Sequence, residues 1–589
     1  MRKLVVCCDG TWNDATQKGS NEFETTNVAR FYNLLDQGQA NQRCFYQPGV
    51  GTGGFFDRHI GGMYGRGLGK QIMACYQWLV TEYQPGDIIY LIGFSRGAFC
   101  ARSLAGLINR YGILCNRFDS AKALSKAVKT LYRKGYQYGL EDYQLPRPMD
   151  FHPHSTAIGF VGVWDTVGAL GIPDDLVLFD LFDAPRRYRF HDVELSPAVL
   201  NGRHALAIDE QRSSFFPTLW SNKHHPSVKQ VWFAGAHGDV GGGYAERGSA
   251  DISLAWMIDE ACSPHLNGEV PALSFSHDVT AILAPNPEAP IHNTYQGIMR
   301  FLLPHPRSIP NLADEVTVHD SVRQRQNADL HPIYRPECGV CTSGVSLTIS
   351  ANEAWNWTGV YIQAGVSYRI QCADEWVDAP LEVASNGIRL PQMRLRILLQ
   401  LGGSLIDHLE WAVKRIINKQ RADLFLSRRI PKEPWFCVMA AIADAPNPSH
   451  DGTPPHHKVL RVGKSLTWTA ASSGYLYLFA NDAWAHYGHN SGSLEVNVEQ
   501  LSDTESAVFG ESAAPSASAE SAGSADTLET VDTVDTVDTV EALDTLDTLE
   551  AVDTVETLDT LDTLEAVEAA ESTETIKESE TKTETNNRL

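Results

Sequence analysis

A serine flanked by two glycines is the clearest site for chemistry in this chain of 589 residues. The pentapeptide Gly93-Phe94-Ser95-Arg96-Gly97 follows an apolar run at residues 87–93 and precedes a segment with helical character at residues 98–110. A strand, a G-x-S-x-G turn and a helix in this order expose a serine hydroxyl as a nucleophile. Glycines are needed because the strand and the helix pass too close for side chains. We therefore predict that Ser95 is a nucleophile.

A nucleophilic serine needs a histidine base and an acid that orients the base. In sheet hydrolases these residues follow in the order serine, acid, histidine, each at the carboxyl end of a later strand. The apolar run at residues 156–164 ends at Asp165, and the run at residues 230–236 ends at His237. The sequence therefore predicts a catalytic triad of Ser95, Asp165 and His237.

Two other aspartates could serve as the triad acid. Asp209 follows the apolar residues 206–208, and Asp239 lies two residues after His237. Each is also explained as a structural carboxylate that binds loop backbone. The glycines around His237 predict a loop with the freedom to reach the serine.

An oxyanion hole requires two backbone N–H donors. The first candidate is the amide of Arg96, directly after the nucleophile. The second is the amide of Gly10 or Thr11, in the loop that follows the first predicted strand, where Asp9 would orient the loop by accepting its N–H groups. A capped strand exit without a catalytic role is the alternative for this loop.

Two phosphate-handling motifs are matched only in part. Asp9-Gly10-Thr11 resembles the motif of haloacid dehalogenase-type phosphatases, but Cys7 stands where their nucleophilic aspartate belongs. The glycine-rich run before Lys70 resembles a phosphate-binding loop, yet Gln71 replaces the metal-binding serine or threonine. Both interpretations fail at an essential residue.

The elements that must position these residues indicate two folded domains. Continuous apolar strands alternate with helical segments up to about residue 270, which predicts an α/β class domain: an α/β-hydrolase-like parallel sheet with helices on both faces, spanning residues 1–340. From residue 345, short alternating strands predict a C-terminal antiparallel β-sandwich of jelly-roll type over residues 341–502. A basic helical insertion near residues 390–430 fits either a packed helical hairpin or a helix at a membrane surface.

The remaining residues, 503–589, form an acidic low-complexity tail of Asp-Thr-Val and Asp-Thr-Leu triplets. A three-residue period matches neither a helix nor a strand, so we predict that this tail is disordered. The formal net charge is −24, yet residues 502–589 hold 24 acidic and three basic residues, which leaves −3 for the body. The charge of the body therefore gives no indication of an anionic partner, and we expect no nucleic acid.

The sequence also bears on the cellular compartment. Eleven cysteines, mostly in apolar runs, indicate folding in a reducing compartment rather than a disulfide framework. The N-terminal apolar run is too short for a signal peptide, and no run approaches the ~20 apolar residues of a membrane span. We expect a soluble protein, cytoplasmic as synthesised, with any export depending on a specialised secretion system.

The motifs together resemble a family of bacterial and fungal α/β-hydrolase domains that includes type VI secretion lipase effectors. The resemblance rests on five motifs in order over about residues 1–330: Cys8-Asp9-Gly10-Thr11-Trp12-Asn13, Gly49-Val50-Gly51-Thr52, Gly93-Phe94-Ser95-Arg96-Gly97-Ala98, Val163-Trp164-Asp165-Thr166-Val167-Gly168 and the segment from Gly235 to Tyr244. It implies an ester hydrolase with a triad of the Ser95, Asp165 and His237 kind, and phospholipase activity, of phospholipase A type, as in the effector members.

The second domain is similar to bacterial lectins that bind galactose through calcium. The similarity is carried by the segment from Phe479 to Leu494, in which Asp482 and Asn490 match calcium ligands, whereas His489 replaces an asparagine. Imidazole is a poor calcium ligand beside hard oxygens. The resemblance implies a jelly-roll fold, with calcium and a carbohydrate as its ligands; the alternative is a sandwich that binds neither.

The leading expectation is a serine ester hydrolase that acts on lipid or phospholipid esters and needs no cofactor for hydrolysis. The alternative is a carbohydrate- or surface-binding protein whose hydrolase domain is an inactive scaffold.

Overall fold

The computed structural model describes most of the two predicted folded domains. The residues described are 1–10, 25–49, 64–137, 150–152, 157–168, 194–222, 227–263, 270–276, 279–295, 304–332, 334, 344–376, 385–386, 429–430, 432–445, 447–448 and 457–502. The predicted helical insertion near 390–430 falls almost wholly outside these residues, and so does the predicted disordered tail.

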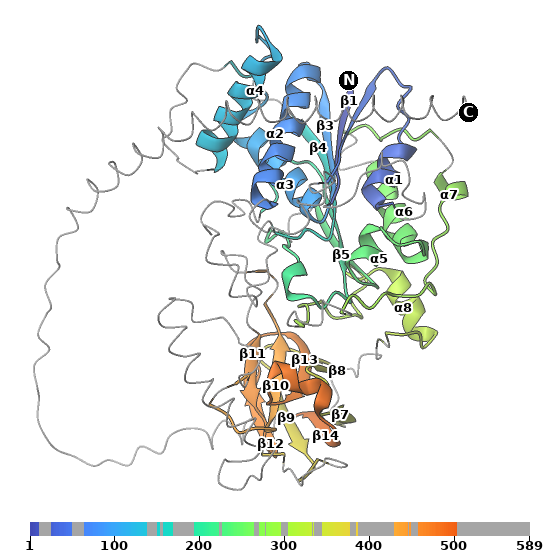
Figure 1. The fold of residues 1–589 in the computed structure, drawn as a ribbon. Helices are drawn as coiled ribbons and strands as arrows, with labels where there is room; N and C mark the ends of the chain where they lie inside the picture. Colours follow the sequence, from blue (N-terminus) through green and yellow to red (C-terminus); the bar gives the residue numbers. More distant parts are fainter. Residues whose placement is uncertain are drawn as a thin grey trace, which may run out of the picture. The chain divides into compact units, whose positions relative to one another are not determined.

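A six-stranded parallel sheet forms the centre of the N-terminal domain (Figure 1). Its strands are β1 (Lys3–Cys8), β2 (Gln42–Gln47), β3 (Ile88–Phe94), β4 (Ala157–Trp164), β5 (Gly202–Ala207) and β6 (Val228–Phe233). The strand order is β2-β1-β3-β4-β5-β6, and every neighbouring pair is parallel. The α/β class predicted from the continuous apolar strands is therefore confirmed.

Helices cover both faces of this sheet. The helices of the domain are α1 (Asn27–Leu34), α2 (Tyr64–Glu82), α3 (Arg96–Tyr111), α4 (Ala121–Thr130), α5 (His237–Gly241), α6 (Gly248–Cys262), α7 (Val279–Ile282) and α8 (Asp320–Asn327). Figure 1 shows α2 and α3 on one face and α1 and α6 on the other. No helix in the described parts of the chain is long and apolar enough to cross a membrane.

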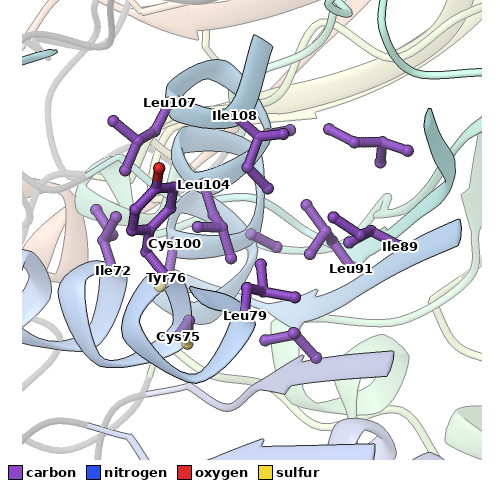
Figure 2. Packing of buried hydrophobic residues seen from close by; sticks show 14 of the residues in the cluster. Ile72, Cys75, Tyr76, Leu79, Ile89, Leu91, Cys100, Leu104, Leu107 and Ile108 are labelled. Atoms are coloured by element: carbon purple, nitrogen blue, oxygen red, sulfur yellow. The ribbon is translucent and has the colours of Figure 1, made fainter. Parts of the chain in front are cut away.

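Alternate residues of the buried strands supply the two cores. Leu4 and Val6 of β1 belong to the core beneath α2 and α3, whereas Val5 belongs to the core beneath α1 and α6. This follows from the two-residue period of a strand, because successive side chains point to opposite faces. Figure 2 shows the first core, where Tyr76 of α2 and Leu104 of α3 pack over β3. Both faces of the sheet are thus apolar, as a parallel sheet covered on both sides requires.

The strand order reverses between β1 and β3. From β1 the chain passes to β2 on one side, and it then returns to β3 on the other. Ligands of doubly wound sheets bind outside the carboxyl ends of the strands at such a reversal, because the adjacent loops diverge there. Asp9 and Gly10 follow β1, and Ser95 follows β3, so the first two predicted site elements flank this position.

Several element boundaries differ from those expected from the sequence. Helix α2 begins within the glycine-rich run before Lys70, and β2 and β5 were not predicted as strands. β2 mixes polar and half-buried residues, because it is the edge strand of the sheet. His237 is the first residue of the short helix α5 rather than part of an open loop. A helix fixes the direction of the imidazole more firmly than the predicted glycine loop would.

The C-terminal domain is an antiparallel β-sandwich of two four-stranded sheets. The strands are β7 (Val345–Ser350), β8 (Asn356–Ile362), β9 (Ser367–Cys372), β10 (Val438–Ala443), β11 (Lys458–Arg461), β12 (Ser465–Thr469), β13 (Gly474–Ala480) and β14 (Ser493–Gln500). Their orders are β11-β10-β13-β8 and β12-β9-β14-β7. Apolar residues from both sheets, including Ile349, Ile370, Ile442 and Leu476, form one buried core. The predicted sandwich class is confirmed.

Candidate active site

Ser95 occupies a strained turn between β3 and α3. Its backbone angles, φ 56° and ψ −122°, lie in a region that non-glycine residues rarely adopt. Ser95 precedes the first residue of α3, yet its side chain does not cap the helix. The turn is tied to the sheet because the Ser95 N–H donates to the carbonyl of Trp164 at 3.0 Å. The strain therefore directs the hydroxyl away from the local capping bond that a serine normally makes at this position.

Glycine is required at both ends of the turn. A Cβ atom on Gly93 would overlap the carbonyl group of Gly97, and one on Gly97 would overlap the carbonyl oxygen of Cys8. The close passage of strand and helix predicted from the motif is therefore present.

His237 and Asp165 form a hydrogen-bonded pair at the carboxyl ends of β6 and β4. The Nδ1 atom of His237 lies 2.6 Å from Oδ2 of Asp165. Burial acts to raise the pKa of Asp165, but the charge of Arg307 and the hydrogen bonds from His237 and Arg307 outweigh it and hold that pKa below its usual range. An ionised carboxylate can only accept, so Nδ1 carries the proton and Nε2 is left as the basic nitrogen.

Aromatic rings surround the imidazole of His237. The ring of Phe94 lies 4.6 Å and that of Phe215 5.0 Å from it, centroid to centroid. The side chain of His237 is 8% exposed. These contacts restrict both rotation of the imidazole and the entry of water around it.

Asp209 and Asp239, the alternative acids, hold backbone in place. Oδ2 of Asp209 accepts the N–H of Gly235 at 2.6 Å and the hydroxyl of Tyr334. Oδ2 of Asp239 accepts the N–H groups of Ala236 at 2.9 Å and of His292 at 3.0 Å.

Among the described residues, neither alternative acid is hydrogen-bonded to the His237 ring. Oδ1 of Asp239 lies 2.6 Å from Nδ1 of His292, whose ring stacks on Tyr244. Of the three aspartates, Asp165 is the one bonded to the His237 ring, and the other two support the segment that carries it.

The loop after β1 is anchored by Asp9. Oδ1 of this buried carboxylate accepts the N–H of Gly10 at 2.6 Å, and Oδ2 accepts the hydroxyls of Thr26 and Tyr46. Burial raises the pKa of Asp9 to about 6 despite these bonds. Asp9 thus accepts an N–H group of this loop, as the predicted orienting role requires. The N–H of Gly10 itself is bound to the carboxylate.

Of the other two predicted oxyanion donors, Arg96 lies within the described residues and Thr11 does not. Arg96 is in the first turn of α3, where backbone N–H groups have no acceptor within the helix. Thr11 lies outside the described residues. Both remain predictions.

Three further residues support the pair and were not predicted. Arg307 binds both oxygens of Asp165, with Nη1 to Oδ1 at 2.6 Å and Nη2 to Oδ2 at 2.9 Å. His204 accepts the N–H of Thr166 at 3.1 Å, directly after Asp165, whose φ of 37° is left-handed. Glu210 accepts the N–H of His237 at 3.3 Å. In the sequence, these residues are single polar residues without a motif, and only the fold brings them to the pair.

The predicted calcium residues in the sandwich face each other as a hydrogen-bonded pair. Oδ2 of Asp482 accepts Nδ2 of Asn490 at 2.9 Å, and Oδ1 accepts the N–H of Ala483 at 2.7 Å. Nδ2 of Asn490 also donates to the carbonyl of Ala351, so two acceptors fix the direction of the amide. Calcium would need the amide oxygen on that side. This arrangement does not fit a calcium site, and calcium binding stays a prediction from the sequence.

The cysteines of the described residues are free thiols, and three of them cluster in the core. The sulfur atoms of Cys8, Cys75 and Cys100 lie within 4.8 Å of one another and are buried. Figure 2 shows Cys75 and Cys100 among the aliphatic side chains of α2 and α3. They pack there as small apolar groups.

The parallel sheet, with a strained serine at the turn after β3 and a buried acid–histidine pair at the ends of β4 and β6, defines a domain of the α/β-hydrolase class. Residues 2–260 match the model of a family described as the type VI secretion system phospholipase effector Tle1-like catalytic domain. The N-terminal domain is thus similar to the catalytic domain of a phospholipase effector family.

A curated relative matches a smaller part of the chain. An uncharacterized protein of Saccharomyces cerevisiae, YEL023C, is 31% identical over 234 residues, which are 36% of this chain and 32% of that protein. The match therefore spans about a third of the curated relative.

Three solved structures are similar to parts of this chain at low sequence identity. An uncharacterized protein from Pseudomonas aeruginosa is 19% identical, with a TM-score of 0.30, over 49% of each chain. The Tle1 effector bound to the VgrG spike is 19% identical, with a TM-score of 0.26, over 41% of this chain and 51% of that one. The EclA N-terminal domain, a PllA-like lectin, is 17% identical, with a TM-score of 0.16, over 27% of this chain and all of that one.

Proposed function

We propose that the chain hydrolyses carboxylic ester bonds of phospholipids with Ser95 as nucleophile, His237 as general base and Asp165 as the acid that orients it. The observation that carries the proposal is the 2.6 Å bond between His237 and Asp165. The His237 ring lies 4.6 Å from the ring of Phe94, which precedes the strained Ser95, in a domain similar to the phospholipase effector family. Delivery by a type VI secretion system is part of the proposal, because the family is one of secreted effectors.

The mechanism follows from these positions. Oγ of Ser95 attacks the acyl carbonyl carbon while Nε2 of His237 takes the hydroxyl proton. The carbonyl oxygen becomes an oxyanion, which the amide of Arg96 and an amide of the loop after β1 stabilise. The C–O bond to the glycerol side then breaks, and His237 returns the proton to the leaving alcohol. Water, deprotonated by His237, releases the fatty acid and restores Ser95.

A fluorophosphonate probe tests the nucleophile. We expect one label on the full chain, no label after Ser95→Ala, and unchanged labelling after Ser103→Ala, since Ser103 is a buried serine on the same helix α3. Equal labelling of the wild type and Ser95→Ala would disprove the assignment.

A mass-spectrometric screen of phospholipids tests the substrate class. Release of a fatty acid together with a lysophospholipid identifies carboxylic ester hydrolysis, and release of a phosphorylated headgroup would contradict it. A labelled enzyme that cleaves no lipid would support an esterase with another substrate. The alternative of a carbohydrate-binding protein with an inactive scaffold requires that neither labelling nor hydrolysis occurs.

A further inference from the structure

A short proline-rich segment lies against both the candidate acid and the β-sandwich. Residues 304–310 read Pro-His-Pro-Arg-Ser-Ile-Pro, and the alternating prolines favour an extended, stiff backbone that lacks several N–H donors. The segment carries Arg307, 142 residues after Asp165 and beyond the part of the chain that matches the effector family.

We propose that Arg307 is a positioning residue for Asp165, and that the β-sandwich holds Arg307 in place and so completes the active site. This inference rests on the proposed function, in which Asp165 orients the general base. It gives the second domain a role in catalysis that is separate from any ligand it binds.

Arg307 fixes the plane of the Asp165 carboxylate. The two oxygens of Asp165 receive separate Nη atoms of the guanidinium. Oδ1 also accepts the N–H of Ala207 at 3.1 Å, and Oδ2 also lies 2.6 Å from Nδ1 of His237. Each oxygen thus has two donors, so the carboxylate cannot rotate without breaking several bonds. The orientation of the His237 ring follows from that of the carboxylate.

The guanidinium is itself held by the catalytic domain. Arg307 is 2% exposed, Nη1 donates to the carbonyl of Ala207 at 2.7 Å, and Nη2 donates to the carbonyl of Phe215 at 2.6 Å. The planar guanidinium makes charge-assisted bonds to a carboxylate and to two carbonyls at the same time. The ammonium group of a lysine cannot make all of these bonds.

The β-sandwich binds the backbone on either side of Arg307. Nε1 of Trp355 donates to the carbonyl of Pro304 at 2.7 Å, and Nε2 of His457 lies 2.7 Å from the carbonyl of Pro306. The hydroxyl of Ser308 donates to the carbonyl of Ala445 at 2.6 Å. Because the prolines have no N–H, each of them can be held only through its carbonyl. The N–H of His305, between two prolines, donates to the carbonyl of Gln211 in the catalytic domain at 2.7 Å.

Aromatic and apolar packing reinforces these bonds. The rings of His305 and His457 stack with centroids 4.4 Å apart. Ile309 and Leu312 share a buried cluster with Tyr475 of β13, and the Tyr475 hydroxyl accepts the N–H of Leu312 at 2.9 Å. Movement of the sandwich would therefore move the segment that carries Arg307.

Charged groups on all neighbouring elements bear on the pair of Asp165 and His237. Arg307 faces the carboxylate, and Glu210, paired with Arg212, accepts the N–H of His237. Two further groups among the described residues are His204, which binds the backbone after Asp165, and Arg102 of α3, which acts on His204. Loss of the Arg307 charge removes the cation bound to both oxygens of Asp165, the carboxylate that accepts from Nδ1 of His237.

Steady-state kinetics of the full chain on a p-nitrophenyl ester test Arg307. We expect Arg307→Gln to lower kcat by ~10–100-fold with a much smaller change in KM, and to move the acidic limb of the kcat/KM profile to higher pH. Arg307→Lys should restore part of kcat. The control is Arg203→Gln, because buried Arg203 likewise pairs with an acid, Glu260, and binds two carbonyls, those of Gly202 and Ser227. It should leave the pH profile unchanged.

A double variant tests the hold of the sandwich. Trp355→Phe combined with His457→Phe keeps aromatic rings but removes both donors to the proline carbonyls. We expect kcat to fall by ~3–10-fold, with the same shift of the acidic limb as in Arg307→Gln. The matched control is Tyr368→Phe, which removes a sandwich hydroxyl bonded to the N–H of Gln363.

The outcomes separate the two proposals. An active wild type with an unchanged Arg307→Gln variant, or an equal loss in Arg203→Gln, would overturn the role of Arg307 and leave the proposed function intact. A double variant with a wild-type profile would overturn the role of the sandwich. A wild type without esterase activity and labelled equally after Ser95→Ala would instead overturn the proposed function.

Discussion

Gly97 is in direct backbone contact with Cys8, the last residue of β1. A Cβ atom on Gly97 would overlap the carbonyl oxygen of Cys8 and lie 2.7 Å from the carbonyl carbon of Asp9. The helix that begins after Ser95 therefore rests on the strand exit that leads to the predicted oxyanion loop. This contact couples the nucleophile turn to the loop without any side chain.

Gly97→Ala should accordingly separate these two backbones. We expect a loss of stability of about 1–3 kcal/mol or more, since the added methyl meets backbone rather than a flexible side chain, together with a large loss of esterase activity. Denaturant unfolding and ester hydrolysis measure the two effects. Gly168→Ala is the control, because a Cβ on Gly168 meets nothing within 4 Å. Equal behaviour of the two variants would refute the argument.

Asp165→Asn should lower kcat by roughly 10⁴-fold. The amide can present its NH₂ to His237 and so favour the wrong tautomer, and it leaves the charge of Arg307 buried without a partner. Breaking a buried pair in this way costs about 3–5 kcal/mol, so the variant should also be less stable. Rates per folded molecule, with unfolding curves, separate the two losses.

The alternative acids and a distant ion pair serve as comparisons for that variant. Asp209→Asn and Asp239→Asn should leave the proton on Nδ1 of His237, because Asp165 is unchanged in both. Asp251→Asn removes the partner of Arg30 elsewhere in the domain. Loss of turnover in Asp209→Asn alone would transfer the role of the acid to Asp209.

Asp209 should make stability fall as the pH rises through weakly acidic values. Burial raises its pKa to about 6 against the hydrogen bonds from Tyr334 and Gly235. The unfolded chain has a pKa of about 3.9, so between these values the folded state binds the extra proton, and stability decreases with increasing pH. Above about pH 6 the penalty is complete, and below about pH 4 it is absent.

Asp209→Asn lacks this penalty. Relative to the wild type, it should gain on the order of 1–3 kcal/mol between pH 4.5 and pH 8, measured by urea unfolding at both values. Asp320→Asn provides the contrast, because hydrogen bonds from Gln324 and Arg323 lower the pKa of the exposed Asp320. The stabilisation from a lowered carboxyl pKa is nearly complete above about pH 4, so the difference between this variant and the wild type should be almost the same at both pH values. A pH-independent difference for Asp209→Asn would contradict the assignment.

The buried thiols should resist alkylation in the folded chain. Burial raises the pKa of Cys7 and of Cys100, so neither supplies a thiolate near neutral pH. Cys115 is partly exposed. We expect iodoacetamide to modify Cys115 at least ~10³-fold faster than the other two, because their reaction requires opening of the core. Peptide mass spectrometry over time measures this, and comparable rates would show that the core opens readily.

Four of the six parallel strands, and the residues that follow three of them, could be predicted from the sequence. The apolar runs before Ser95, Asp165 and His237 form β3, β4 and β6, and these residues follow the strands as expected. This succeeds because a buried parallel strand requires a continuous apolar run, and its carboxyl end marks where polar residues meet. The half-buried edge strand β2 gave no such signal.

Only the tertiary structure showed which of three aspartates contacts the His237 ring, and which residues hold that aspartate in place. Asp165, Asp209 and Asp239 all follow strands, and only the positions of β4 to β6 decide which carboxylate contacts the His237 ring. Arg307 could not be assigned from the sequence, because a bond between residues 142 positions apart has no periodicity or motif. Local pattern determined the strands before Ser95, Asp165 and His237, and the nucleophile turn. Long-range packing alone decided which charges are buried together, since that depends on distances in the folded chain.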